Sequence, residues 1–60
     1  MIIEERLLSS VKAVYDFIAE MQNIPGTVRV EQGPYVVNGK SIMGLFSLDL
    51  MKPVTVKIGQ

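Results

Sequence analysis

The chain has 60 residues, 48% of them hydrophobic, and its six acidic side chains balance six basic ones. This length suits one marginally stable domain, expected over residues 1–60, and the balanced charge argues against nucleic acid or an anionic membrane as a partner. Because the chain has neither cysteine nor histidine, we expect no disulfide, metal site or cofactor and predict that it is not an enzyme.

The first predicted elements are a strand and a helix. Ile2 and Ile3 favour a short strand within Ile2–Leu8, although an early helix turn is also compatible with this segment. A helix is predicted over Ser9–Asn23, because a serine can cap its first turn and the following Pro-Gly pair prevents its continuation. The apolar residues that share one face of this helix are Val11, Val14, Tyr15, Ile18 and Met21.

The second half of the chain predicts three strands and one more helix. Alternating side chains and turn signals place them at Thr27–Glu31, Tyr35–Val37, Ser41–Met51 (the helix) and Val54–Ile58. Within the helix, Leu45, Leu48 and Met51 are expected to face inward. The order (β)αββαβ predicts an α+β fold, in which two helices cover one face of a small antiparallel sheet.

The segment Val37–Leu48 resembles the second-helix signature of HPr, the histidine-containing phosphocarrier of the bacterial sugar phosphotransferase system. The most specific part is the run Lys-Ser-Ile-Met-Gly at residues 40–44, and the likeness extends over nearly the whole chain. It implies an HPr-like fold in which the last strand pairs with the Thr27–Glu31 strand. It also implies regulatory phosphorylation at Ser41, and protein partners such as an HPr kinase-like enzyme or phosphotransferase-system components.

The chain departs from this family where the active histidine should stand. Ser10 occupies that place, Lys12 replaces the family's arginine and Ala13 its proline. A serine ester would not pass on its phosphoryl group as a phosphoramidate does, so the leading interpretation is a degenerate HPr-like binding or regulatory protein. Two alternatives are a phosphocarrier-related protein that accepts phosphate on Ser10, and a structural module that only self-associates.

Each candidate site also has a simpler structural explanation. Ser41 is either a phosphoacceptor or only a helix cap, and Ser10 with Lys12 is either an anion site or a cap beside a solvated charge. The resemblance to HPr also implies a partner or dimer surface on the two helices, whose residues could instead be core: Tyr15, Ile42, Met43 and Phe46.

Self-association and a cytoplasmic location complete the predictions. The family's final helix is absent from this sequence, which would leave Val54, Val56 and Ile58 uncovered. We therefore predict a homodimer or higher oligomer, with contacts on the second helix and near Val56. No apolar run is long enough to span a bilayer or resembles a signal peptide, which favours a cytoplasmic protein without membrane association.

Overall fold

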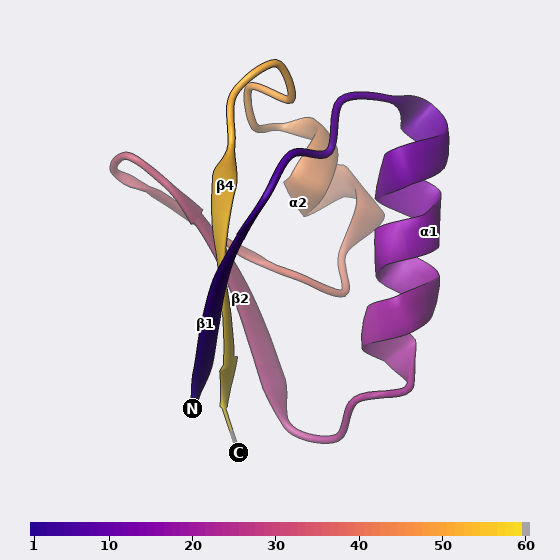
Figure 1. Cartoon of the computed structure of the whole chain (residues 1–60), viewed down its shortest axis with the longest axis vertical. Helices are drawn as coiled ribbons and strands as arrows, with labels where there is room; N and C mark the ends of the chain where they lie inside the picture. The colour runs from indigo at the N-terminus through magenta and orange to yellow at the C-terminus, as the bar shows by residue number, and fades with distance from the viewer. Residues whose placement is uncertain (60) are drawn as a thin grey trace.

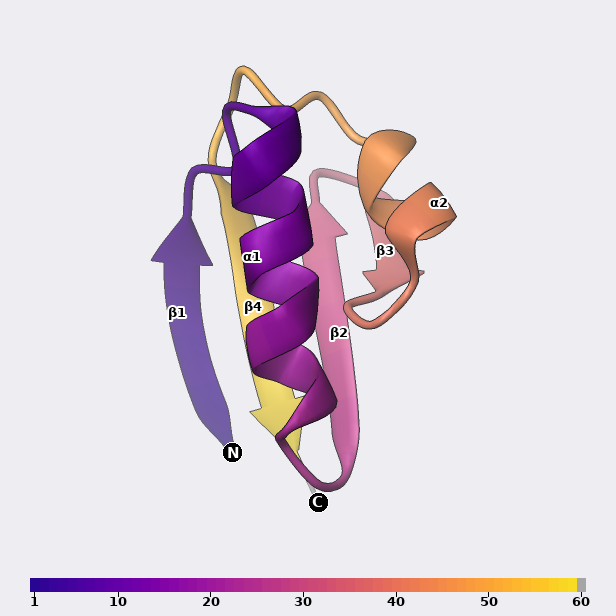
Figure 2. The same ribbon diagram turned by 90° about the vertical axis from the view of Figure 1, so that its right-hand side faces the viewer.

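Two layers make up the structure, a computed structural model that describes residues 1–59 (Figure 1). One layer is an antiparallel sheet in the order β1 (Ile2–Arg6), β4 (Val54–Gly59), β2 (Thr27–Gln32) and β3 (Tyr35–Asn38). The other layer contains the helices α1 (Val11–Gln22) and α2 (Ile42–Phe46), which lie on the same face of the sheet (Figure 2). The predicted α+β class and the pairing of the last strand with β2 are therefore confirmed.

The register of β2 and β4 separates an apolar face from a polar one. Val28 is opposite Ile58 and Val30 is opposite Val56, and these four side chains point toward the helices. The residues between them, including Arg29, lie on the open face, because successive side chains of a strand point to opposite sides. The alternation predicted for both strands is thus confirmed.

The face of α1 that packs on the sheet agrees only in part with the predicted one, since Val14, Ile18 and Met21 contact the core while Val11 and Tyr15 do not. Val14, Phe17 and Met21 are fully buried, whereas Val11 and Tyr15 are 59% and 54% exposed. The spacing i, i+3, i+7 of the buried residues is a helical stripe of its own. Apolar side chains surround more than one side of this helix, so packing against the sheet decided which of them became core.

The prediction that the apolar face of β4 lacks a cover is wrong for most of the strand. Val54 and Val56 are 1% and 0% exposed, because α1 lies across β4 and β2 (Figure 2). Leu8, in the connection between β1 and α1, also belongs to this core, and Ile58 is partly buried against it. The burial of Val54 and Val56 contradicts the prediction that this apolar face near Val56 contributes contacts between copies of the chain.

The second helix is shorter than predicted, since α2 ends at Phe46 and not at Met51. The Ser47 hydroxyl donates to the carbonyl of Gly44 at 2.6 Å, which closes the last turn. Beyond it, the Gln32 side chain binds both backbone groups of Asp49, accepting from its N–H at 2.8 Å and donating to its carbonyl at 2.7 Å. The chain after α2 is thus held as a loop against the end of β2, and Met51 is 79% exposed instead of facing inward.

Candidate functional site

Ser10 opens α1 as its N-cap, which supports the structural explanation for this residue. Its backbone is extended and its hydroxyl accepts a hydrogen bond from the N–H of Ala13 at 3.0 Å. Its carbonyl accepts from the N–H of Val14 at 3.1 Å, as the first bond of the helix. The hydroxyl is exposed, yet no described side chain within hydrogen-bonding distance could remove its proton.

Lys12 is not directed to Ser10. Its ammonium forms an ion pair with the Asp16 carboxylate, one turn further along α1, at 2.6 Å. Both side chains are largely exposed, so the pair is of the ordinary i,i+4 kind that stabilises helix surfaces weakly. The structure therefore does not bring Ser10 and Lys12 together into an anion site.

Ser41 is the N-cap of α2, as the sequence predicted. Its hydroxyl accepts a hydrogen bond from the N–H of Gly44 at 3.2 Å, and its carbonyl accepts one from the N–H of Leu45 at 3.1 Å. The preceding Lys40 extends its ammonium away to the carbonyl of Ile24 at 2.7 Å, where it ties this turn to the end of α1. Ser41 itself is only partly buried.

An exposed apolar surface spans the two helices. The rings of Tyr15 in α1 and Phe46 in α2 meet edge to face, with centroids 6.3 Å apart and planes at 71°. Met43, one turn before Phe46, is 81% exposed, and Val11 lies one turn before Tyr15. We call Val11, Tyr15, Met43 and Phe46 the two-helix surface. Three of the four predicted surface residues belong to it, whereas Ile42 is partly buried and packs against the core.

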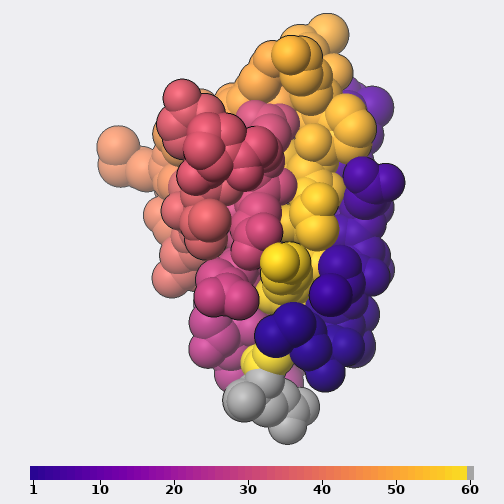
Figure 3. All heavy atoms as spheres, turned by 90° about the vertical axis from the view of Figure 1, so that its left-hand side faces the viewer, coloured from indigo at the N-terminus to yellow at the C-terminus, as the bar shows by residue number. Residues whose placement is uncertain are grey.

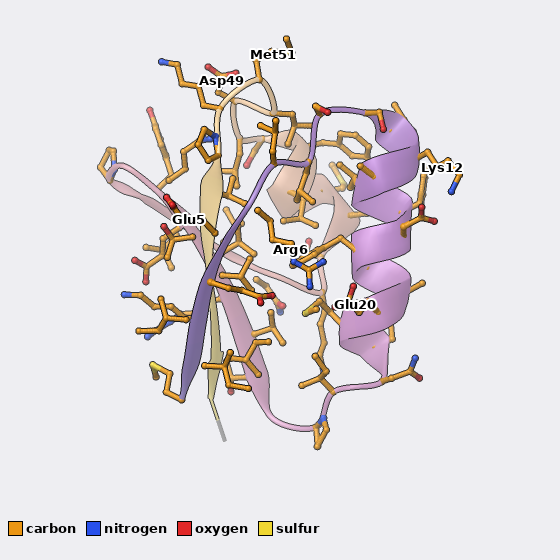
Figure 4. All side chains as sticks on the ribbon, viewed as in Figure 1. Glu5, Arg6, Lys12, Glu20, Asp49 and Met51 are labelled. Atoms are coloured by element: carbon orange, nitrogen blue, oxygen red, sulfur yellow. The ribbon has the colours of Figure 1, made fainter. Side chains whose placement is uncertain are left out.

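A second group of side chains lies on the other side of α1. Arg6 of β1 forms hydrogen bonds to Glu20 of α1, and the two point toward each other (Figure 4). The hydrogen bond to Glu20 raises the pKa of Arg6, and the same bond lowers the pKa of the Glu20 carboxyl below its ordinary value. Both groups are therefore held in their charged forms, as suits a structural ion pair and not a proton-transfer site.

The described residues offer no metal site. Within residues 1–59, no three His, Cys, Asp or Glu side chains gather closely enough to hold an ion. No helix in the same range is long and apolar enough to cross a bilayer.

Comparison of the chain with protein-family models and with curated proteins finds no significant match. The site is therefore interpreted from its own geometry. The Tyr15–Phe46 contact could not be read from the sequence, because it depends on how α1 and α2 pack against each other. The helical period predicts Val11 on the same apolar face as Val14 and Met21, whereas the rotation of α1 in the fold leaves Val11 on the surface.

Proposed function

We propose that this chain is a degenerate HPr-like module that binds and regulates a protein partner and does not transfer phosphate through histidine. The observation that carries the proposal is the Tyr15–Phe46 contact, which joins exposed apolar side chains of two helices into one surface. The order β1-β4-β2-β3, with two serine-capped helices on one face, supports the resemblance stated for Val37–Leu48.

The composition of the two-helix surface favours a protein partner. Aromatic residues and methionine are enriched where proteins bind one another, and a contiguous apolar patch on a small monomer often marks such a site. Phe46 is 40% exposed, so part of its ring is available to a partner while the rest packs in the fold. Both helices contribute buried residues to the same core, which holds the backbone of the patch in one arrangement.

Phosphorylation at Ser41 would provide regulation. A phosphate adds about −2 charge at neutral pH. Ser41 stands at the start of α2, whose exposed residues Met43 and Phe46 follow within the next five positions. Such a charge beside an apolar contact would weaken the binding of a hydrophobic partner, because the phosphate would lose water when the partner binds. By this proposal Ser41 is both a helix cap and a switch.

The direct test measures binding to the general phosphotransferase-system enzyme and to an HPr kinase by calorimetry. We expect Phe46→Lys to weaken binding by tenfold or more, which is about 1.4 kcal/mol. Tyr35→Lys is the matched control, because Tyr35 is an aromatic residue on β3 that is 65% exposed and lies outside the two-helix surface. Equal affinity of both variants and the parent chain would refute the proposed surface, and so would failure of either protein to bind the parent.

Kinase and phosphotransfer assays address the chemistry. The kinase should modify the parent chain and leave Ser41→Ala unmodified. The general enzyme with phosphoenolpyruvate should leave no phosphate on the chain, because the hydroxyl of Ser10 is engaged as a cap and lacks a base. Stable phosphate on Ser10 would instead favour the alternative of a serine-based phosphoacceptor.

Self-association through the same surface is the second candidate function. It is favoured by the high exposure of Met43 and Val11, 81% and 59%, beside the paired rings. A two-fold dimer would bury this patch on both copies in one interface. Sedimentation equilibrium should then show a dimer that Phe46→Lys dissociates, whereas a monomer at all concentrations would exclude this candidate.

A further inference from the structure

The open face of the sheet, opposite the helices, brings two cations directly against each other. Arg29 of β2 and Lys57 of β4 are opposite in the antiparallel register, and both side chains leave the sheet on this face. Beside them is a hollow of about 220 Å³. Figure 3 views the molecule from this side. The residues that line the hollow are Met1, Thr27, Arg29, Lys57 and Gly59.

The charges around the hollow are only partly balanced. Lys57 forms an ion pair with Glu31, with 3.1 Å between its ammonium nitrogen and the nearer carboxylate oxygen. Among the ion pairs of residues 1–59, none includes Arg29. Like charges directly opposite in a sheet destabilise it. Within residues 1–59, the sheet therefore places a guanidinium that forms no ion pair opposite an ammonium that is paired with Glu31, in a position where a bound anion would relieve the repulsion.

The shape of the hollow leaves room for such an anion. A single water takes about 30 Å³ of liquid volume, so the hollow holds more than one. Thr27 and Gly59 are opposite each other in the register, and glycine places no side chain over the space between the strands. A Cβ atom at Gly59 would come within 3.4 Å of the Met1 side chain, which forms the wall on that side.

We propose that this hollow binds a small dianionic oxyanion of the phosphate type. The planar guanidinium of Arg29 can donate two parallel hydrogen bonds to two oxygens, and the Lys57 ammonium adds a point charge. The Thr27 hydroxyl supplies a neutral donor at the rim. The anion would supply a counter-charge for Arg29 and would compete with Glu31 for Lys57. This site is independent of the two-helix surface and of the function proposed for it.

The test is a titration of the ¹⁵N-labelled chain with inorganic phosphate, followed by NMR at constant ionic strength with chloride as the balancing ion. We expect saturable shifts of the amides of Thr27, Arg29 and Gly59, and binding at least tenfold weaker in Arg29→Gln. Lys52→Gln is the control, because Lys52 is an exposed lysine in the loop before β4, and its replacement should leave the affinity for phosphate unchanged. A phosphate monoester such as glycerol phosphate, titrated separately, shows whether a substituted phosphate also fits. Saturable binding of either probe at these amides supports the site, and no saturation with both overturns it.

Thermal unfolding gives a second and independent readout. At low ionic strength in chloride, Arg29→Gln should melt at a higher temperature than the parent, because it removes one of the two opposed charges. Phosphate should raise the melting temperature of the parent more than chloride of equal ionic strength, and this gain should be absent in Arg29→Gln. If phosphate raises both melting temperatures equally, it acts as a general stabilising salt, and the proposed site is refuted.

Discussion

The guanidinium of Arg6 binds the carboxylate of Glu20 through both terminal nitrogens, at 3.0 and 2.6 Å, and thereby joins β1 to α1. Its central carbon also lies 5.3 Å from the centre of the buried Phe17 ring. Arg6 thus covers the side of the core between β1 and α1 with its stem and its planar head (Figure 4). One charged side chain thus shields this flank of the core.

Replacing Arg6 by alanine should destabilise the fold. The exposed ion pair contributes about 0.2–1 kcal/mol, and the contact with the aromatic face about 0.5–1 kcal/mol. We therefore expect a loss of about 1–2 kcal/mol in the free energy of unfolding by urea. Lys12→Ala is the control, because its exposed pair with Asp16 is worth only about 0.3–0.5 kcal/mol. Equal losses in both variants would show that Arg6 does not shield the core.

The Arg6–Glu20 pair should also make stability depend on acid. The hydrogen bond from Arg6 lowers the pKa of Glu20 in the folded protein, against a smaller opposing effect of desolvation. This contribution is fully present above the unfolded-state pKa of about 4.3 and is lost as the pH falls through the lower folded value. Glu20→Gln should therefore be less stable than the parent at pH 7 and nearly equal to it at pH 2. Denaturant unfolding across this range measures the difference, and a constant gap at every pH would contradict the assignment.

Gly39 should tolerate no side chain. A Cβ atom there would lie 2.4 Å from Cγ1 of Val28, and the backbone N–H of Gly39 is held by the Val28 carbonyl at 2.8 Å. Since the backbone cannot move aside, Gly39→Ala should cost about 1–3 kcal/mol through overpacking. Gly33→Asn is the contrast, because Gly33 has open space around it at φ +58°, which asparagine adopts readily. Comparable melting temperatures of the two variants would disprove the steric explanation.

The loop after α2 should loosen when its clamp is removed. Gln32→Ala deletes both hydrogen bonds to the backbone of Asp49, and each is worth about 0.5–1.5 kcal/mol. We expect a modest loss of global stability and hydrogen exchange of the Asp49 amide that is at least tenfold faster. Gln22→Ala, at the exposed end of α1, should leave that amide unchanged. An unaltered exchange rate in Gln32→Ala would mean that the loop is held by other contacts.

The helix caps and the strands of this protein follow from sequence patterns that extend over only a few neighbouring residues. Ser10 and Ser41 cap the helices because a serine hydroxyl serves the free amides of the next turn. The alternation in β2 and β4 identifies strands with one apolar face. For Met43 and Phe46 the sequence left a contact surface and a place in the core both open, and the structure exposes them by 81% and 40%.

The amino-acid sequence by itself determined the order of the elements after the first, their helix caps and the α+β class, and it left Ile2–Leu8 open between strand and helix until the pairing with β4 decided for a strand. The tertiary structure alone decided which face of α1 became core, placing Phe17 inside and Tyr15 outside. It also ended α2 early, because Gln32 from a distant strand binds the backbone after it. The opposition of Arg29 and Lys57 arises only from strand register. Caps and periods act through neighbouring residues, whereas helix rotation and register are set by packing between segments far apart in the chain.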